Sequence, residues 1–307
     1  MQSCTIPALV LLGASGCLAQ PRLGAPVTLE VEVAVRVGDS MTTPAVEVPE
    51  GFWYQHPLDC EWQRREKAVG QWAFATFETP TPPGTTDPAV DLRPNWKTTY
   101  RVTVWEVRTD NAAQCEAGPL AADDPAGAFL DPQAPDVAWV LQQCPEFEQV
   151  AESLFAQPGS AWERAKRTWD YVAANHSEFG KCYLRSSLFC GLLRRQGVPA
   201  RLIGGLCSRA WAHHVWAEYY LPGYGWAPVD WIPGSGFDIV SAKHLAFWRG
   251  SPPPRPASRQ AMPVNRPVVC GQKVDSSTPL SVEHRVTCTS VVAATSPERA
   301  AFSLRPY

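Results

Sequence analysis

Apolar and polar residues alternate along much of the first third of the chain, a pattern typical of β-strands with one buried face. Proline, glycine and threonine turns separate four such runs. The runs are VTLEVEVAVRV (27–37), AVEVP (45–49), QWAFATFE (71–78) and TTYRVTVWEVR (98–108). They predict an antiparallel β-sandwich domain over residues 25–115.

Helical spacing of apolar residues replaces this alternation in the middle of the chain. Residues 136–155 are predicted to be helical, with a break at Pro145. Ser160 and Glu163 form a capping box that predicts a helix over 160–176. Its apolar stripe, which we interpret as core, consists of Trp162, Ala165, Trp169, Val172 and Ala173.

A further helix is predicted to begin at Cys182. Its apolar residues recur at spacings of three and four, at Leu184, Leu188, Phe189, Leu192 and Leu193. Charged and polar residues fall largely on other faces, at Arg185, Arg194, Arg195 and Gln196. Gly197 and Pro199 end the helix. Cys182 therefore lies at the start of the helix, where the dipole favours a thiolate, whereas Cys190 reads as a buried core residue.

Residues 212–231 predict a β-hairpin around the turn Pro222-Gly223-Tyr224-Gly225. The turn places His214 and Asp230 roughly opposite each other on neighbouring strands, with a small offset or bulge. His213 competes with His214, because adjacent strand residues point to opposite faces and spacing alone does not choose between them.

Nucleophilic acyl transfer by a cysteine uses three side chains: a cysteine at a helix start, a histidine and a carboxylate. The thiol needs a base within hydrogen-bond reach, and the carboxylate fixes the orientation and tautomer of that base. The pattern therefore predicts a site built from Cys182, His214 and Asp230. A purely structural disulfide at Cys182 stays open as another interpretation.

These residues also resemble the transglutaminase-like superfamily, the papain-like group that includes bacterial transglutaminase-core proteins. The resemblance is carried by GKC (180–182), LLRRQGVPARLIGG (192–205) and HVWAEYYLPGYGWAPVD (214–230). Gly197 lies fifteen residues beyond Cys182 and Asp230 sixteen beyond His214, as in the family pattern. The match selects His214 over His213 and Cys182 over Cys190.

The resemblance implies an α+β chain in which residues 130–250 form a papain-like catalytic domain, with helices packed on an antiparallel sheet. It implies cysteine-dependent acyl transfer at an amide, a peptide bond or a glutamine side chain, by hydrolysis or transamidation and without a cofactor. The substrate class is protein or peptide. A catalytically silent transglutaminase-like binding or scaffold module of the cell envelope stays open as the alternative.

Three further motif residues lie close to the histidine in the sequence or on the preceding predicted strand. Arg201 and Trp216 are interpreted as structural, one as an anchor between helix and strand and the other as packing beside the histidine. Glu218 shares the strand face of His214, and both a nearby hydrogen bond and solvent exposure stay open for it.

Composition narrows the function classes further. The 307 residues suggest two domains, and an apolar content of 45% is ample for hydrophobic cores. A formal net charge of −3 without a basic run gives no case for nucleic-acid binding. The sequence has no C-x-x-C pair and its histidines are scattered, so no metal site is predicted. Nothing in it indicates an oligomeric state.

Residues 1–19 are interpreted as a signal peptide, because Ile6 to Ala14 is apolar and Cys17-Leu18-Ala19 is similar to a signal-peptidase site. The expected location is therefore periplasmic, cell-envelope or secreted. A lipoprotein signal with a lipid anchor at Cys17 stays open. No other segment is long and apolar enough to predict a membrane span.

Export favours disulfide bonds. The cysteines predicted to form them are Cys60, Cys115, Cys144, Cys207, Cys270 and Cys288. Their pairing is not derivable, although Cys270–Cys288 and Cys60–Cys115 are the simplest choices. Residues 251–307 are interpreted as a proline-rich linker and a short β tail, whose two strands within 268–293 form a last hairpin packed back on one domain.

Overall fold

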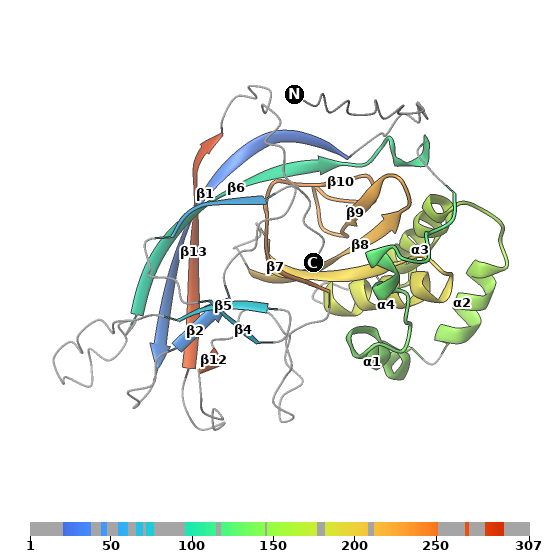
Figure 1. The fold of residues 1–307 in the computed structure, drawn as a ribbon, viewed down its shortest axis with the longest axis horizontal. Coiled ribbons are helices and arrows are strands. Elements are labelled where there is room, and N and C mark those ends of the chain that lie inside the picture. The colour runs from blue at the N-terminus through green and yellow to red at the C-terminus, as the bar shows by residue number, and fades with distance from the viewer. Residues whose placement is uncertain are drawn as a thin grey trace, which may run out of the picture.

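A computed structural model gives the structure of the chain (Figure 1). It describes the backbone of residues 21–37, 44–47, 55–60, 66–69, 72–76, 96–114, 118–144, 146–176, 182–207, 212–250, 268–269 and 280–291. Side chains are described for residues 21–31, 101–114, 118–140, 144, 146–176, 182–207 and 214–250. The predicted signal peptide and Cys17 lie outside these ranges.

The long alternating runs form an antiparallel sheet that the two ends of the chain share. It contains β1 (Arg22–Val37), β3 (Gln55–Cys60), β6 (Trp96–Arg108), β10 (Ile239–Val240) and β13 (Leu280–Val291). The order is β10-β6-β1-β13, and β3 also pairs with β6. Strand β13 pairs with β1 from Val27 opposite Val291 to Val37 opposite Leu280. The C-terminal tail is therefore an integral strand of the N-terminal sheet.

A smaller sheet has the order β12-β2-β5-β4. Its strands are β2 (Pro44–Glu47), β4 (Glu66–Val69), β5 (Trp72–Thr76) and β12 (Val268–Val269). The predicted β-sandwich over residues 25–115 is not confirmed, and both sheets take a strand from the end of the chain. The predicted C-terminal hairpin is wrong, because β12 and β13 are both strands but pair in different sheets.

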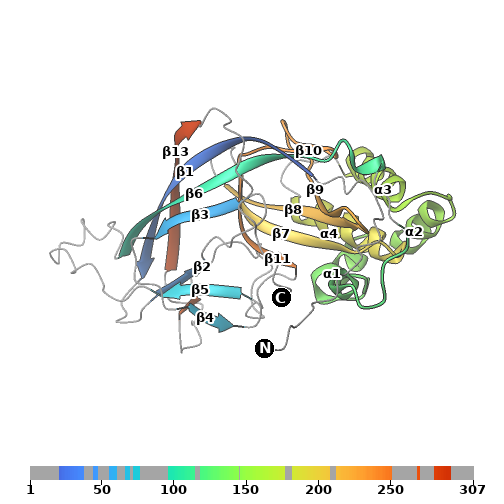
Figure 2. The same cartoon turned by 45° about the horizontal axis from the view of Figure 1, so that its top comes forward.

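Within the described residues, two short 3-10 turns, η1 (Ala112–Gln114) and η2 (Pro125–Phe129), precede four α-helices. They are α1 (Pro135–Gln143), α2 (Phe147–Phe155), α3 (Ala161–Asn175) and α4 (Cys182–Arg195). The predicted break between α1 and α2 and the capping box of Ser160 and Glu163 are both confirmed. Figure 2 shows the helices together at one end of the molecule.

A third antiparallel sheet, of order β11-β7-β8-β9, lies beside the helices. Its strands are β7 (Ala200–Cys207), β8 (Ala212–Leu221), β9 (Gly225–Val229) and β11 (His244–Gly250). Gly205 permits the close approach of β11, since a Cβ there would lie 1.9 Å from the carbonyl oxygen of Leu245. Helix α4 contacts β7, β8 and each of the other three helices.

Because other elements surround α4, residues outside its apolar stripe are buried as well. Arg194 and Gln196, which the spacing places largely on other faces, are both buried. The guanidinium of Arg194 pairs with the carboxylate of Asp136 at 2.9 and 2.6 Å and also donates to the carbonyl oxygen of Ala200. Cys190 is fully buried as predicted, and burial raises the pKa of its thiol.

The cysteine side chains that the structure describes form no disulfide bond. Cys144 and Cys207 carry thiols, so the prediction that they are bridged is wrong. The side chains of Cys60, Cys115, Cys270 and Cys288 lie outside the described residues, as do both proposed pairings. Within the described part of the chain, no helix has the length and apolar character that crossing a bilayer requires.

Candidate active site

Helix α4 begins at Cys182 and is fixed against the sheet one turn later. Ser186, four residues on and on the same helix face, donates a hydrogen bond of 3.0 Å to the carbonyl oxygen of Val215. Val215 follows His214 on β8. This bond ties the first turn of the helix to the strand residue beside the histidine, and the thiol of Cys182 remains partly exposed.

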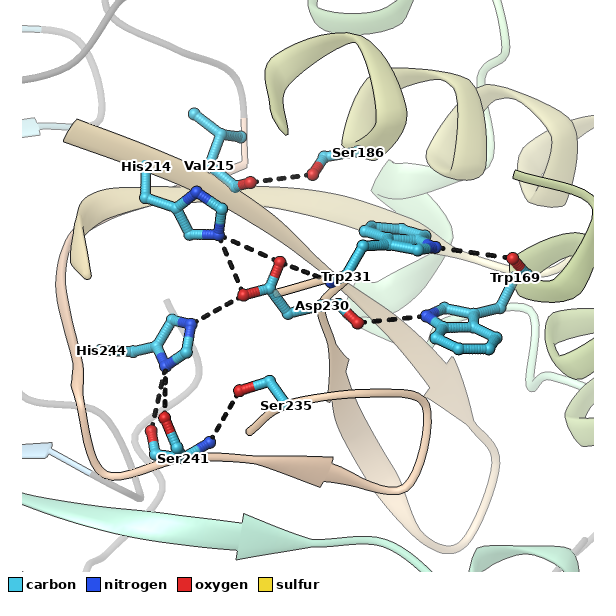
Figure 3. A network of polar contacts seen from close by, with 9 residues as sticks. All are labelled: Trp169, Ser186, His214, Val215, Asp230, Trp231, Ser235, Ser241 and His244. Atoms are coloured by element: carbon cyan, nitrogen blue, oxygen red, sulfur yellow. Dashed lines mark hydrogen bonds and ion pairs between the residues drawn. The ribbon is translucent and has the colours of Figure 1, made fainter. Parts of the chain in front are cut away.

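The hairpin of β8 and β9 brings the imidazole and the carboxylate together. Ala217 pairs with Val229, so Asp230 follows the last residue of β9 and lies diagonal to His214. The Nε2 atom of His214 lies 3.0 and 2.9 Å from the two carboxylate oxygens of Asp230 (Figure 3). The side chain of Cys182 is hydrogen-bonded to the same imidazole. Because Nε2 faces Asp230, Nδ1 is the nitrogen left for the thiol.

Asp230 is held by its neighbours through both backbone and side chain. The amide of Trp231 donates to Oδ1 at 2.7 Å, and the indole of Trp169 donates to the main-chain oxygen of Asp230 at 3.2 Å. The rings of Trp169 and Trp231 stack at 6.2 Å. His214 and Asp230 are 5% and 1% exposed, so the acid–base pair is buried, whereas Cys182 is a half-buried residue.

Charge pairing within the site favours the ionised forms of both buried partners. Burial acts to lower the pKa of His214, but the charge and hydrogen bond of Asp230, together with the hydrogen bond of Cys182, outweigh it and raise that pKa to about 11. Burial likewise opposes the Asp230 carboxylate, yet the charge of His214 and hydrogen bonds from His214 and His244 lower its pKa. The imidazole is therefore an imidazolium at neutral pH.

His244, the first residue of β11, is a member of this network that the sequence pattern does not reveal. Its Nε2 atom lies 2.8 Å from Oδ2 of Asp230, and the side chain is 2% exposed. His244 lies beyond the hairpin and outside the motif blocks, so neither strand alternation nor family spacing indicates it. The pairing of β11 with β7 places it.

The other motif residues have structural contacts. Trp216 is buried and its ring stacks beside that of His214 at 6.0 Å. Arg201 donates to Oε2 of Glu218 at 2.8 and 2.7 Å, and Glu218 is 1% exposed. Hydrogen bonding rather than solvent exposure is therefore correct for Glu218. The side chain of His213 lies outside the described residues.

Two groups of described residues have ligand types that suit a metal ion, with ligand atoms within 4.8 Å of one another. One is His214, Asp230 and His244, and the other is Cys144, Glu146 and His176. In the first group each imidazole Nε2 is within hydrogen-bond distance of a carboxylate oxygen. The three side chains therefore form hydrogen bonds with one another, with Asp230 as the acceptor between the two histidines.

Residues 148–231 match the family model of the transglutaminase-like superfamily. The resemblance is confirmed over this segment. It runs from α2 to the end of the hairpin and therefore contains Cys182, His214 and Asp230, while His244 lies beyond it.

Among solved structures, the chain is similar to a protein from Cytophaga hutchinsonii that is provisionally named a cysteine protease. The two are 16% identical, with a TM-score of 0.54, over 90% of this chain and 95% of the other. A second, from Parabacteroides distasonis and provisionally named a protease, is 14% identical with a TM-score of 0.27, over 71% of this chain and 47% of the other. No curated protein matches the sequence. The first structure supports a mixed fold of helices and antiparallel sheets.

Proposed function

We propose that the protein is a cysteine acyltransferase or peptidase that acts on amide bonds, with Cys182 as nucleophile, His214 as acid and base, and Asp230 as the group that orients His214. One observation carries the proposal: a partly exposed thiol at the start of a buried helix is hydrogen-bonded to an imidazole that a buried carboxylate holds on its other side.

In the first half-reaction, the Cys182 thiolate attacks the carbonyl carbon of the amide, and a carbon–sulfur bond forms as the carbon–nitrogen bond breaks. The His214 imidazolium gives its proton to the leaving amine. The charge of Asp230 keeps that proton on the ring until it is needed. The backbone N–H of Cys182 at the start of α4 is our candidate donor for the oxyanion.

In the second half-reaction, the neutral imidazole takes a proton from water or a primary amine as that nucleophile attacks the thioester. The carbon–sulfur bond breaks and restores the Cys182 thiolate beside the His214 imidazolium. Forming the thioester removes the hydrogen bond that Cys182 makes to His214, and that bond is one of the causes of the raised histidine pKa. Burial, the largest influence on this group, acts in the opposite direction. Acylation therefore favours the basic form of His214 at the step that requires it.

Alkylation of Cys182 with iodoacetamide at pH 6 tests the activated nucleophile without knowledge of the substrate. We expect faster alkylation than for a cysteine in a short peptide, since few such thiols are ionised at this pH. His214→Ala should slow the reaction, and mass spectrometry of the peptides separates Cys182 from the buried control Cys190. Equal rates in the wild type and His214→Ala would exclude the proposal and leave a silent binding module.

The acceptor requires a separate measurement. Incubation with a glutamine-containing protein and a fluorescent primary amine detects transamidation, while released peptides or ammonia detect hydrolysis. The name of the Cytophaga protein favours the hydrolytic outcome. Cys182→Ser is the matched control, because it abolishes either reaction and retains the size of the side chain.

A further inference from the structure

The second histidine bonded to Asp230 has both of its ring nitrogens facing oxygen atoms. Nε2 of His244 lies 2.8 Å from Oδ2 of Asp230, and Nδ1 lies 3.0 Å from the main-chain oxygen of Ser241. The hydroxyl of Ser241 is farther from Nδ1, at 3.4 Å. Because a carboxylate oxygen only accepts hydrogen bonds, His244 contacts Asp230 by donating from Nε2.

Asp230 consequently has a donor assigned to each side of its carboxylate. Oδ1 accepts from the amide of Trp231, Oδ2 accepts from His244, and both oxygens face Nε2 of His214. Without such contacts, the carboxylate of an aspartate can rotate about its Cβ–Cγ bond. Donors on both oxygens, one of them from a separate strand, remove that freedom and keep the plane of the carboxylate directed at His214 (Figure 3).

The strand that carries His244 is itself constrained. His244 pairs with Cys207 of β7, and its ring lies edge-on to that of Trp216 at 5.0 Å. The titratable groups that the structure places around it are Asp230, His214 and Cys207. Through Asp230, His244 is connected to His214, the imidazole that is hydrogen-bonded to Cys182.

We propose that His244 is a positioning residue, which fixes the Asp230 carboxylate by donating from Nε2 and so sets the orientation and charge of His214 toward Cys182. The inference rests on the proposed function and adds a fourth residue to it. It also assigns β11 a part in the site, although that strand lies beyond the segment matched by the superfamily.

Two amide variants separate the contacts of His244. In His244→Asn the side-chain amide can replace Nδ1 and lacks the donor toward Asp230, whereas the longer amide of His244→Gln can replace Nε2. We expect His244→Asn to slow the alkylation of Cys182 at pH 6 by about tenfold or more, the effect of losing a hydrogen bond to a charged group. His244→Gln should remain within about threefold of the wild type.

The pH dependence distinguishes positioning from a general structural defect. If His244→Asn acts through His214, its alkylation rate approaches the wild-type rate near pH 9, where thiols ionise without assistance. Rates reduced alike at pH 6 and pH 9, equal rates in the two amide variants, or a wild-type rate in His244→Asn would each overturn the positioning role. Unfolding in urea shows whether each variant is folded at the pH of the assay.

Two further measurements distinguish the positioning role of His244 from a failure of the triad and from metal binding. His214→Ala tests the proposed function: if it slows alkylation and His244→Asn does not, only the role of His244 fails. An excess of EDTA tests metal binding by His214, Asp230 and His244. If the chelator slows the wild type as much as His244→Asn does, these side chains hold a metal ion and the positioning role is overturned.

Discussion

At the scale of single residues, the buried ion pair of His214 and Asp230 links the site to the stability of the fold. The pKa of His214 rises from 6.5 to about 11 on folding, so this group stabilises the native state fully below pH 6.5. Its contribution is lost as the pH rises toward about 11. The lowered pKa of Asp230 gives stability above pH 3.8 that is lost in acid. The pair therefore contributes most between these two ordinary values.

The direction of the pKa shift of His214 gives a prediction for His214→Gln, whose side chain cannot become charged. The wild type should exceed the variant in free energy of unfolding by a larger margin at pH 6 than at pH 9, with the margin falling by about 1–3 kcal/mol. Urea denaturation at the two pH values measures it. Subtracting the variant removes the effects of other titrating groups. A margin that stays constant or grows with pH would contradict the ion pair.

The individual residues also show what a sequence can and cannot reveal. Cys182, His214 and Asp230 could be selected because helix starts, hairpin turns and fixed spacings are local patterns, although their catalytic role stays a prediction. His244 could not, because its place beside Asp230 depends on the pairing of β11 with β7. The buried ion pair of Arg194 could not be predicted either, because its partner, Asp136, lies 58 residues earlier in the chain.

At the scale of elements, α4 is a central helix whose charged end is buried in an ion pair. Arg194 and Asp136 are 2% and 1% exposed, while the next residue, Arg195, pairs with Glu148 at about half exposure for both side chains. The helix thus offers two adjacent arginines in opposite environments. Removing the buried one leaves the Asp136 carboxylate buried without its opposite charge.

We therefore expect Arg194→Met to lower the free energy of unfolding by about 3–5 kcal/mol and the matched Arg195→Met by less than about 1 kcal/mol. Urea denaturation at pH 7 measures both. Met retains much of the apolar volume of the arginine stem, so the comparison measures the loss of the buried guanidinium with its ion pair and its hydrogen bonds. Similar losses of stability in the two variants would contradict the burial of the ion pair between Arg194 and Asp136.

At the scale of the whole molecule, the N-terminal sheet supports the loop that connects Asp230 with His244. Strand β10 in this loop pairs with the end of β6, and the amide of Thr109 donates to the carbonyl oxygen of Asp238 at 2.9 Å. Within the loop, the amide of Asp230 donates to Gly236 and that of Gly236 to Ile239. Val107 of β6 also packs in one cluster with Trp216, whose ring lies beside His214.

These contacts predict that the N-terminal sheet and the transglutaminase-like segment unfold together, although the length of the chain suggests two domains. Buried residues of β1 and β6 share one hydrophobic cluster with residues of all four helices, which favours a single cooperative transition. Tryptophan fluorescence and the alkylation of buried Cys190 should give the same urea midpoint. If Cys190 became reactive well after a first fluorescence transition, the sheet would be an independent unit, and its contacts with the loop would not be what holds Asp230 and His244 in place.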